Sequence, residues 1–426
     1  MTITVARLLA RALAAHGVDA VYGAPLDGVD VVPVVEPGVA ELLAAAHRRV
    51  HRCTAAVHRG DGVLTLGHDP IVGVAVPERV VRDAGDLLEP FPATCRVRLE
   101  IDLAAPAPDR VPVGRPAPER WVDPDDEVVA RLVAATAPAV LAGPGVVDAG
   151  AVAGLNAFAT SGDVGVLNTW GAKGVFHWRS RHHWATVGLQ ADDYRLGGFA
   201  TADLIVATGV DPDEAPADQW QLAPVLTVAP GALGPLSERW RRPQAALAVP
   251  PLRAGLAAAT QEGWTVSTAP LPPSRVTLHY GEVFGAGGLV AADPGIAGFW
   301  VARTFSTTEL GSAQVPARRG AGFAAACALV ARLRRPRRAV LAALDAVSGP
   351  VLAVLDAAAA LGVAVPVEVW DGDGPAVDAD AHLARLRLLA VAETPAAPVA
   401  LRTDARQLAR MVDVAGPIVA WEGMLR

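Results

Sequence analysis

The feature that most constrains the fold is an alternation of short apolar strands with helical segments, which recurs along the chain. In residues 122–250, PAVLAGPG predicts a strand that runs into a glycine-rich turn, and DAGAVAGLNAFATSG predicts the helix that follows. VGVLNTWG and LIVATGV predict two further strands. Strands without a polar face that alternate with helices are typical of parallel sheets covered on both sides. The segment is therefore expected to form an α/β domain.

The same alternation flanks this middle segment. In residues 276–426, GGLVAADPG, RAVLAALD and VPVEVWDGDG predict strand ends separated by apolar helical runs. Residues 1–105 open with an amphipathic helical pattern that stops at Gly17, and DAVYG then predicts a short buried strand. The predicted fold class is α/β, with three consecutive α/β domains whose sheets are mostly parallel. The helical repeat at the start consists of Val5, Leu8, Leu9, Ala12 and Leu13.

Proline-rich stretches are expected to join the three segments. LAAPAPDRVPVGRPAPERW, residues 103–121, predicts a stiff and extended surface linker. PLRAGLAAATQEGWTVSTAPLPPSR, residues 251–275, predicts a second joint.

The composition excludes several classes of protein. Hydrophobic residues make up 52% of the chain and charged residues 19%, but Asp, Gly and Pro interrupt every apolar run before the roughly 18 residues that a membrane span needs. The three cysteines are widely spaced, which argues against a disulfide framework and favours a cytoplasmic location. The net charge of −7 is spread over mixed acidic and basic residues, so no nucleic-acid footprint and no membrane partner are predicted.

Lys173 is the only lysine in the chain and lies in the turn GAKG. A phosphate loop is excluded because the required Gly-x-x-x-x-Gly-Lys-Ser/Thr spacing is absent, and Val175 stands where a hydroxyl would be needed. GPGVVDAG also departs from the dinucleotide fingerprint. The neighbouring sequence offers no group that would lower the pKa of Lys173, so a catalytic amine is not predicted.

A cluster of histidines follows Lys173 in the stretch HWRSRHHW. His177, His182 and His183 lack the carboxylate or cysteine partners and the spacing that zinc sites use. A solvated loop with aromatic anchors is the favoured interpretation.

Read together, several stretches resemble the thiamine-diphosphate enzymes of the acetolactate synthase and 2-oxoacid decarboxylase type. ARLLARALAAHGVDAVYGAPLDG is similar to the opening of that family, with Leu26 where its turn ends in glycine. NTWGAKGVF and ADLIVATGV resemble two motifs of its central domain. The resemblance implies a shortened pyrimidine-binding-like domain in 1–105, a Rossmann-like central domain in 122–250 and a diphosphate-binding-like domain in 276–426.

The resemblance also implies where a cofactor would act. The family uses a glutamate after a strand to activate thiamine diphosphate, and Glu36 stands at the end of VVPVV. A solvent-facing carboxylate at a helix start is the alternative interpretation of Glu36. The implied Mg²⁺ ligand is Asp345, with Asp371 or Asp373 as further cofactor-binding residues.

This implied metal site departs from the family pattern. Leu344 and Ala346 replace the glycines of the family's Gly-Asp-Gly, and an aspartate stands where the family has a neutral asparagine. Side chains in place of glycine obstruct close approach of the backbone, and a second acid beside a diphosphate adds like charge. We therefore expect an eroded site in which thiamine diphosphate and Mg²⁺ binding is doubtful.

Three functional hypotheses follow. The chain is a divergent, non-catalytic homologue or one with an altered small-molecule ligand; or it is an active, Mg²⁺-dependent carboligase or decarboxylase acting on a 2-oxoacid; or it is a nucleotide- or flavin-binding protein that uses the central domain. The resemblance further implies a homodimer or homotetramer, because family sites lie between the first domain of one subunit and the third of another.

Overall fold

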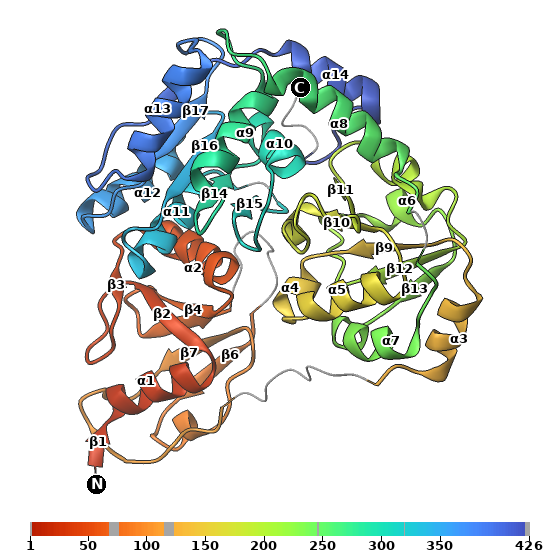
Figure 1. The fold of residues 1–426 in the computed structure, drawn as a ribbon. Coiled ribbons are helices and arrows are strands. Elements are labelled where there is room, and N and C mark those ends of the chain that lie inside the picture. Colours follow the sequence, from red (N-terminus) through yellow and green to blue (C-terminus); the bar gives the residue numbers. More distant parts are fainter. Residues whose placement is uncertain (1, 68–75, 115–122, 245–246, 319, 422–426) are drawn as a thin grey trace.

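A computed structural model describes residues 2–67, 76–114, 123–244, 247–318 and 320–421. Three large sheets follow one another along the chain, each flanked by helices (Figure 1), and a small antiparallel pair of strands lies near the N-terminus. The predicted α/β class with three domains is confirmed, since the second and third sheets are entirely parallel and the first is mixed. No helix in these ranges is long and apolar enough to cross a membrane.

The first domain is built on a sheet of order β3-β2-β4-β5-β7-β6. Strands β3, β2 and β4 are parallel to one another, but β5 runs antiparallel to both β4 and β7. The amphipathic repeat forms α1, whose apolar face is buried against the sheet. The elements are β1 (Thr2–Thr4), α1 (Val5–Ala15), β2 (Val18–Gly23), β3 (Val32–Pro33), α2 (Pro37–His51), β4 (Thr54–His58), β5 (Val63–Leu66), β6 (Glu78–Val81), β7 (Cys95–Leu99) and β8 (Pro106–Pro108).

The central domain is a parallel sheet of order β11-β10-β9-β12-β13. The chain begins at β9 in the middle, moves outward to β11, and returns across β9 to continue at β12. The elements are α3 (Asp126–Ala134), β9 (Pro138–Ala142), α4 (Gly145–Asp148), α5 (Val152–Ser161), β10 (Val166–Thr169), β11 (His183–Val187), β12 (Leu204–Thr208), α6 (Ala217–Trp220), β13 (Val225–Thr227) and α7 (Leu233–Arg239).

The third domain repeats this architecture with the order β15-β14-β16-β17-β18. Strands β14, β16 and β17 are buried along their whole length, which explains why their sequences are nearly continuous apolar runs. The elements are α9 (Pro273–Phe284), β14 (Leu289–Ala292), α10 (Ile296–Thr304), β15 (Ala313–Gln314), α11 (Phe323–Arg334), β16 (Val340–Leu344), α12 (Gly349–Ala360), β17 (Val367–Trp370), α13 (Ala379–Ala390), β18 (Val399–Leu401) and α14 (Arg406–Ala415).

The two predicted joints differ in the structure. Part of the first, residues 115–122, lies outside the described residues. The second is not a simple joint, because its first half folds as a helix, α8 (Pro251–Trp264). Helix α8 packs against α9 and α14 of the third domain and runs past β11 of the central domain (Figure 1). Its one proline, Pro251, stands in the first helical turn, where a missing N–H costs nothing.

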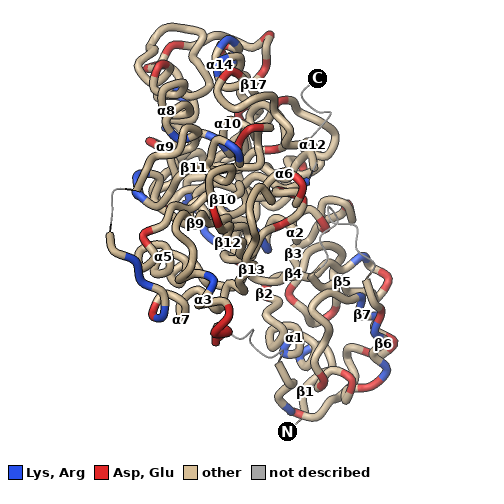
Figure 2. The backbone as a smooth tube through the Cα atoms, turned by 90° about the vertical axis from the view of Figure 1, so that its right-hand side faces the viewer, with Lys and Arg blue, Asp and Glu red and all other residues tan. Residues whose placement is uncertain are grey.

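The first and third domains share one apolar core. Helices α2 and α11 pack against each other, with Leu43 and Ala46 in the same buried cluster as Phe323 and Cys327. The His51 ring is hydrogen-bonded to the carbonyl of Val330 at 3.0 Å. Figure 2 shows that acidic and basic residues are both distributed over all three domains, as the sequence pattern predicted.

Candidate functional site

Glu36 lies where the chain passes from β3 to α2. It is the N-cap residue of α2, yet its side chain makes no capping hydrogen bond and is exposed. The preceding Val35 is fully exposed as well. Glu36 is therefore free to face solvent or a second subunit, and its role as the activating acid stays a prediction.

Asp345 stands at the carboxyl end of β16 and is held by the backbone of α10. Its Oδ2 accepts a hydrogen bond from the Ile296 N–H at 2.6 Å, and its Oδ1 accepts one from the Ala297 N–H at 2.8 Å. A Cβ atom on Gly295 would lie 2.0 Å from Oδ2, so only glycine allows this approach. The Asp345 carboxylate thus caps the first turn of α10.

Asp293 makes the matching arrangement one strand away, at the end of β14. Its Oδ2 accepts from the Gly322 N–H and its Oδ1 from the Ala324 N–H, both at 2.7 Å, so it caps α11. Burial raises the pKa of Asp293 to about 6 against the opposing effect of these bonds, and the nearby Asp345 adds to the rise. Asp293 was not predicted from the sequence, although its position directly after a buried strand was a usable signal.

Asp371 and Asp373 follow β17 in an exposed turn. The Asp371 carboxylate accepts a hydrogen bond from the Asp373 N–H at 3.0 Å, as short acidic side chains do in such turns. Within the described ranges, no three His, Cys, Asp or Glu side chains are grouped so that they could hold a metal ion. The structure does not bring Asp345, Asp371 and Asp373 together as a ligand set.

The central sheet was the predicted location for a nucleotide. In open parallel sheets, ligands bind at the carboxyl ends of the strands where the strand order reverses, which here is between β9 and β12. The turns after these strands are in direct backbone contact, because the Gly145 N–H donates to the Gly209 carbonyl at 2.8 Å. The crevice that a nucleotide would occupy is closed at this point.

A buried acid lies on the same edge of the sheet. Glu214 accepts a 2.5 Å hydrogen bond from the Thr169 hydroxyl and a 3.0 Å bond from the Gly171 N–H. Burial raises the pKa of Glu214 to about 7, so an approaching phosphate would oppose its ionisation further. The geometry therefore disfavours the nucleotide hypothesis at this edge.

Glycine is required where the turn after β9 meets the turn after β12. A Cβ on Gly143 would lie 2.3 Å from the Gly209 carbonyl oxygen and 2.5 Å from the Val210 Cα. We expect Gly143→Ala to lower the free energy of unfolding by about 2–3 kcal/mol, because backbone must move to relieve the overlap. Urea denaturation checks this. Gly349→Ala is the matched control, since nothing lies within 4 Å of its added Cβ; an equal loss in both variants would contradict the close approach.

The histidine cluster does not form a metal site in the described structure. His177 is exposed and its Nδ1 accepts from the Arg179 N–H, whereas the buried His182 ring is hydrogen-bonded to the Val164 carbonyl. His183 points into a pocket beside Lys173. The predicted solvated loop therefore holds for His177 only.

Comparison with known proteins gives a family match for the central domain. Residues 126–227 match the family of thiamine pyrophosphate enzyme central domains. This segment contains the NTWGAKGVF and ADLIVATGV motifs. Residues 126–227 therefore form a domain of the thiamine pyrophosphate enzyme central-domain family.

A likeness in fold extends over nearly the whole chain. A solved structure from Mycobacterium smegmatis, provisionally described as a thiamin diphosphate-dependent enzyme, matches with a TM-score of 0.71 and 15% identity. The match covers 95% of this chain and 100% of that one. No curated protein sequence matches the chain. At this identity the match shows the fold, and the activity has to be inferred from the site.

The enzymes that share this central domain use thiamine diphosphate, usually held with Mg²⁺, so the match raises the question of whether such a cofactor fits here. Diphosphate groups favour helix N-termini, where free N–H groups and the helix dipole attract anions. In this structure, N–H groups in the first turns of α10 and α11 already donate to Asp345 and Asp293. The residues present therefore do not fit the diphosphate and its metal as they stand.

Proposed function

We propose that this chain is a divergent superfamily member that keeps the three-domain scaffold, is not a thiamine-diphosphate catalyst, and acts as a binding protein for another ligand. One observation carries the proposal: the N-termini of α10 and α11 are both capped by carboxylates of their own domain. A diphosphate in this place would displace these bonds and would lie beside two acids, which repel it.

The arrangement around the caps supports the same proposal. Leu344 and Ala346 flank Asp345 with side chains, and the exposed Asp371 is hydrogen-bonded within its own turn. The competing hypothesis, an active 2-oxoacid carboligase or decarboxylase, is favoured by the position of Glu36 between β3 and α2. Assembly into a homodimer or homotetramer, which the family would use to complete a site at Glu36, stays a prediction.

Turnover separates the two hypotheses. We expect no release of carbon dioxide above the buffer rate when the full chain is supplied with thiamine diphosphate, Mg²⁺ and pyruvate or phenylpyruvate. Coupled detection of carbon dioxide and chromatography of ligation products measure this. Release that depends on added thiamine diphosphate and is lost in Glu36→Gln would overturn the proposal, because that variant keeps the side-chain shape and removes only the acid.

A further inference from the structure

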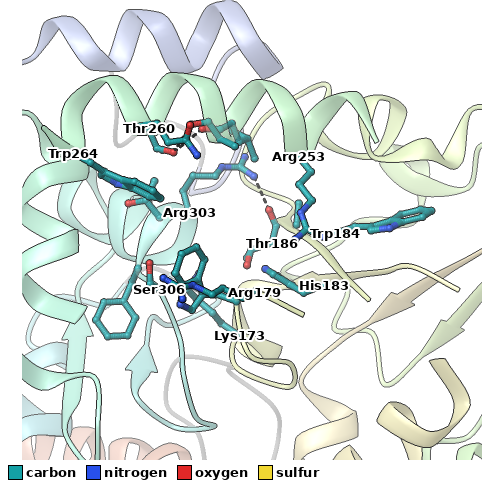
Figure 3. Close-up of a pocket in the computed structure, with 17 residues that line it drawn as sticks. Lys173, Arg179, His183, Trp184, Thr186, Arg253, Thr260, Trp264, Arg303 and Ser306 are labelled. Atoms are coloured by element: carbon teal, nitrogen blue, oxygen red, sulfur yellow. Dashed lines mark hydrogen bonds between the residues drawn. The ribbon is translucent and has the colours of Figure 1, made fainter. Parts of the chain in front are cut away.

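A pocket of about 350 Å³ lies between the central domain and the third domain. Its walls come from helix α8, strand β11, the turn after β10 and the C-terminal end of α10 (Figure 3). Neither Asp345 nor Glu36 nor the turns after β9 and β12 line it. The volume is at the low end of the roughly 300–1,000 Å³ that small-molecule sites occupy, which suits a ligand with one ring.

The lining of this pocket is cationic. Lys173, Arg179, Arg253 and Arg303 contribute to it, and none of the lining residues is an Asp or Glu. The Arg303 guanidinium forms an ion pair with the buried Asp193 carboxylate, with 2.7 Å between Nη2 and Oδ1. Lys173 is only 7% exposed, and its ammonium has no hydrogen bond or ion pair in the part of the chain that the structure describes. A buried charge without a partner is costly and favours an anion beside it.

His183 adds a second unpartnered group. Its Nδ1 is buried and has no hydrogen-bond partner among the described residues. Burial, the Lys173 ammonium and the Arg253 guanidinium lower the pKa of His183 to about 3, so the ring is neutral at physiological pH. Burial, followed by the charge of Arg303, lowers the pKa of Lys173 to about 7. Burial and neighbouring cations thus lower the pKa of both groups.

Aromatic side chains form the remaining walls. Trp178 and Trp264 meet edge to face with their ring centroids 6.3 Å apart, and Trp184 and Phe305 also line the pocket. Flat apolar walls of this kind favour a planar apolar body, because aromatic rings stack or pack edge to face with little loss of conformational freedom. The cationic side chains of the lining thus suit an anionic group, and the aromatic side chains suit a planar apolar body on the same ligand.

We propose that this pocket binds a small aromatic carboxylate, with its carboxylate between Lys173 and Arg253 and its ring against the tryptophans. The inference goes beyond the proposed function, since it rests on the pocket alone and holds whether or not thiamine diphosphate binds elsewhere. The bound carboxylate stabilises the charged form of Lys173, so binding at alkaline pH takes up a proton.

The test uses the full chain and follows tryptophan fluorescence and heat on titration with benzoate. Benzamide, which has the same shape without the charge, and inorganic phosphate, which has the charge without the ring, are the matched probes. We expect benzoate to bind at least about tenfold more tightly than either, and about tenfold more tightly at pH 6 than at pH 9. Calorimetry in buffers of different ionisation heats reports the proton uptake.

Variants identify the pocket. We expect Lys173→Met to weaken benzoate binding by about tenfold or more and to remove its pH dependence, while Arg387→Met, at an exposed ion pair elsewhere, changes nothing. If Lys173→Met does not fold, Arg253→Met is expected to show the same weakening. Equal affinities for benzoate and benzamide, phosphate binding as tight as benzoate binding, or undiminished binding in the pocket variants would overturn the inference.

Discussion

In the folded protein, Lys173 is expected to lose its proton near pH 7, far below the ordinary lysine pKa of 10.5. Its side chain is buried, Arg303 is close to it, and no acid in the described structure compensates either effect. Because this is the only lysine, incorporation of isotope-labelled lysine gives a single side-chain signal by NMR, and its shift can be followed against pH. A midpoint near 10.5 would contradict the buried placement.

The same shift has a large consequence for stability. Between about pH 7 and 10.5 the unfolded chain binds more protons at Lys173 than the folded chain does, so this side chain's contribution to the free energy of unfolding rises with pH across that interval. Below pH 7 the charged, buried lysine destabilises the fold in full. One pKa unit corresponds to about 1.4 kcal/mol, so the penalty is several kcal/mol.

Lys173→Met removes the charge and keeps the length of the side chain. We expect this variant to be more stable than the wild type by about 2–5 kcal/mol near pH 6, with the difference declining as the pH approaches 10. Chemical denaturation at a series of pH values measures it. Arg387→Met serves as the control for loss of an exposed cation, and a wild type that is more stable than Lys173→Met at acid pH would contradict the account.

Asp345→Ala is expected to lower the free energy of unfolding by about 2–4 kcal/mol, because two N–H groups at the start of α10 lose their acceptors. Burial raises the pKa of Asp345 in spite of these bonds, so the stability comes from hydrogen-bond acceptance more than from charge. Asp345→Asn retains one carbonyl acceptor, and we expect it to cost less than half as much.

The sign of this effect separates a structural cap from a metal ligand. An acid that the fold holds only for binding a cation adds unfavourable burial and charge, so its removal from a metal-free protein leaves stability unchanged or increases it. Thermal unfolding of the metal-free wild type and both Asp345 variants measures the sign. A gain in stability in Asp345→Ala would show that the carboxylate is not primarily a cap.

The sequence predicted the fold because its signals are local. Buried parallel strands read as apolar runs, and the i, i+3, i+4 repeat of α1 is visible within its own residues. Helix α8 was predicted as part of a joint because residues 251–275 contain several prolines and many small residues, which are typical of linkers. Its helical state depends on packing against α9 and α14, which the local sequence does not reveal.

The site was harder to predict because its properties arise from distant segments. The position of Asp345 at a strand end could be inferred, but its donors belong to α10, about fifty residues earlier in the chain. The pKa of Lys173 depends on Arg303 and on burial under α8, neither of which is a sequence neighbour. Charge and solvent exposure at a site are tertiary properties, so residue types and spacing alone left Lys173 without a role.

The central claim is that the carboxylates of the third domain have taken over the place of the cofactor. Calorimetric titration of the full chain with thiamine diphosphate and Mg²⁺, for the wild type and for Asp345→Ala, tests it most directly. The account predicts no heat of binding for either protein up to millimolar cofactor, where the binding free energy would be only about −4 kcal/mol. Tight binding by the wild type that Asp345→Ala abolishes would contradict it.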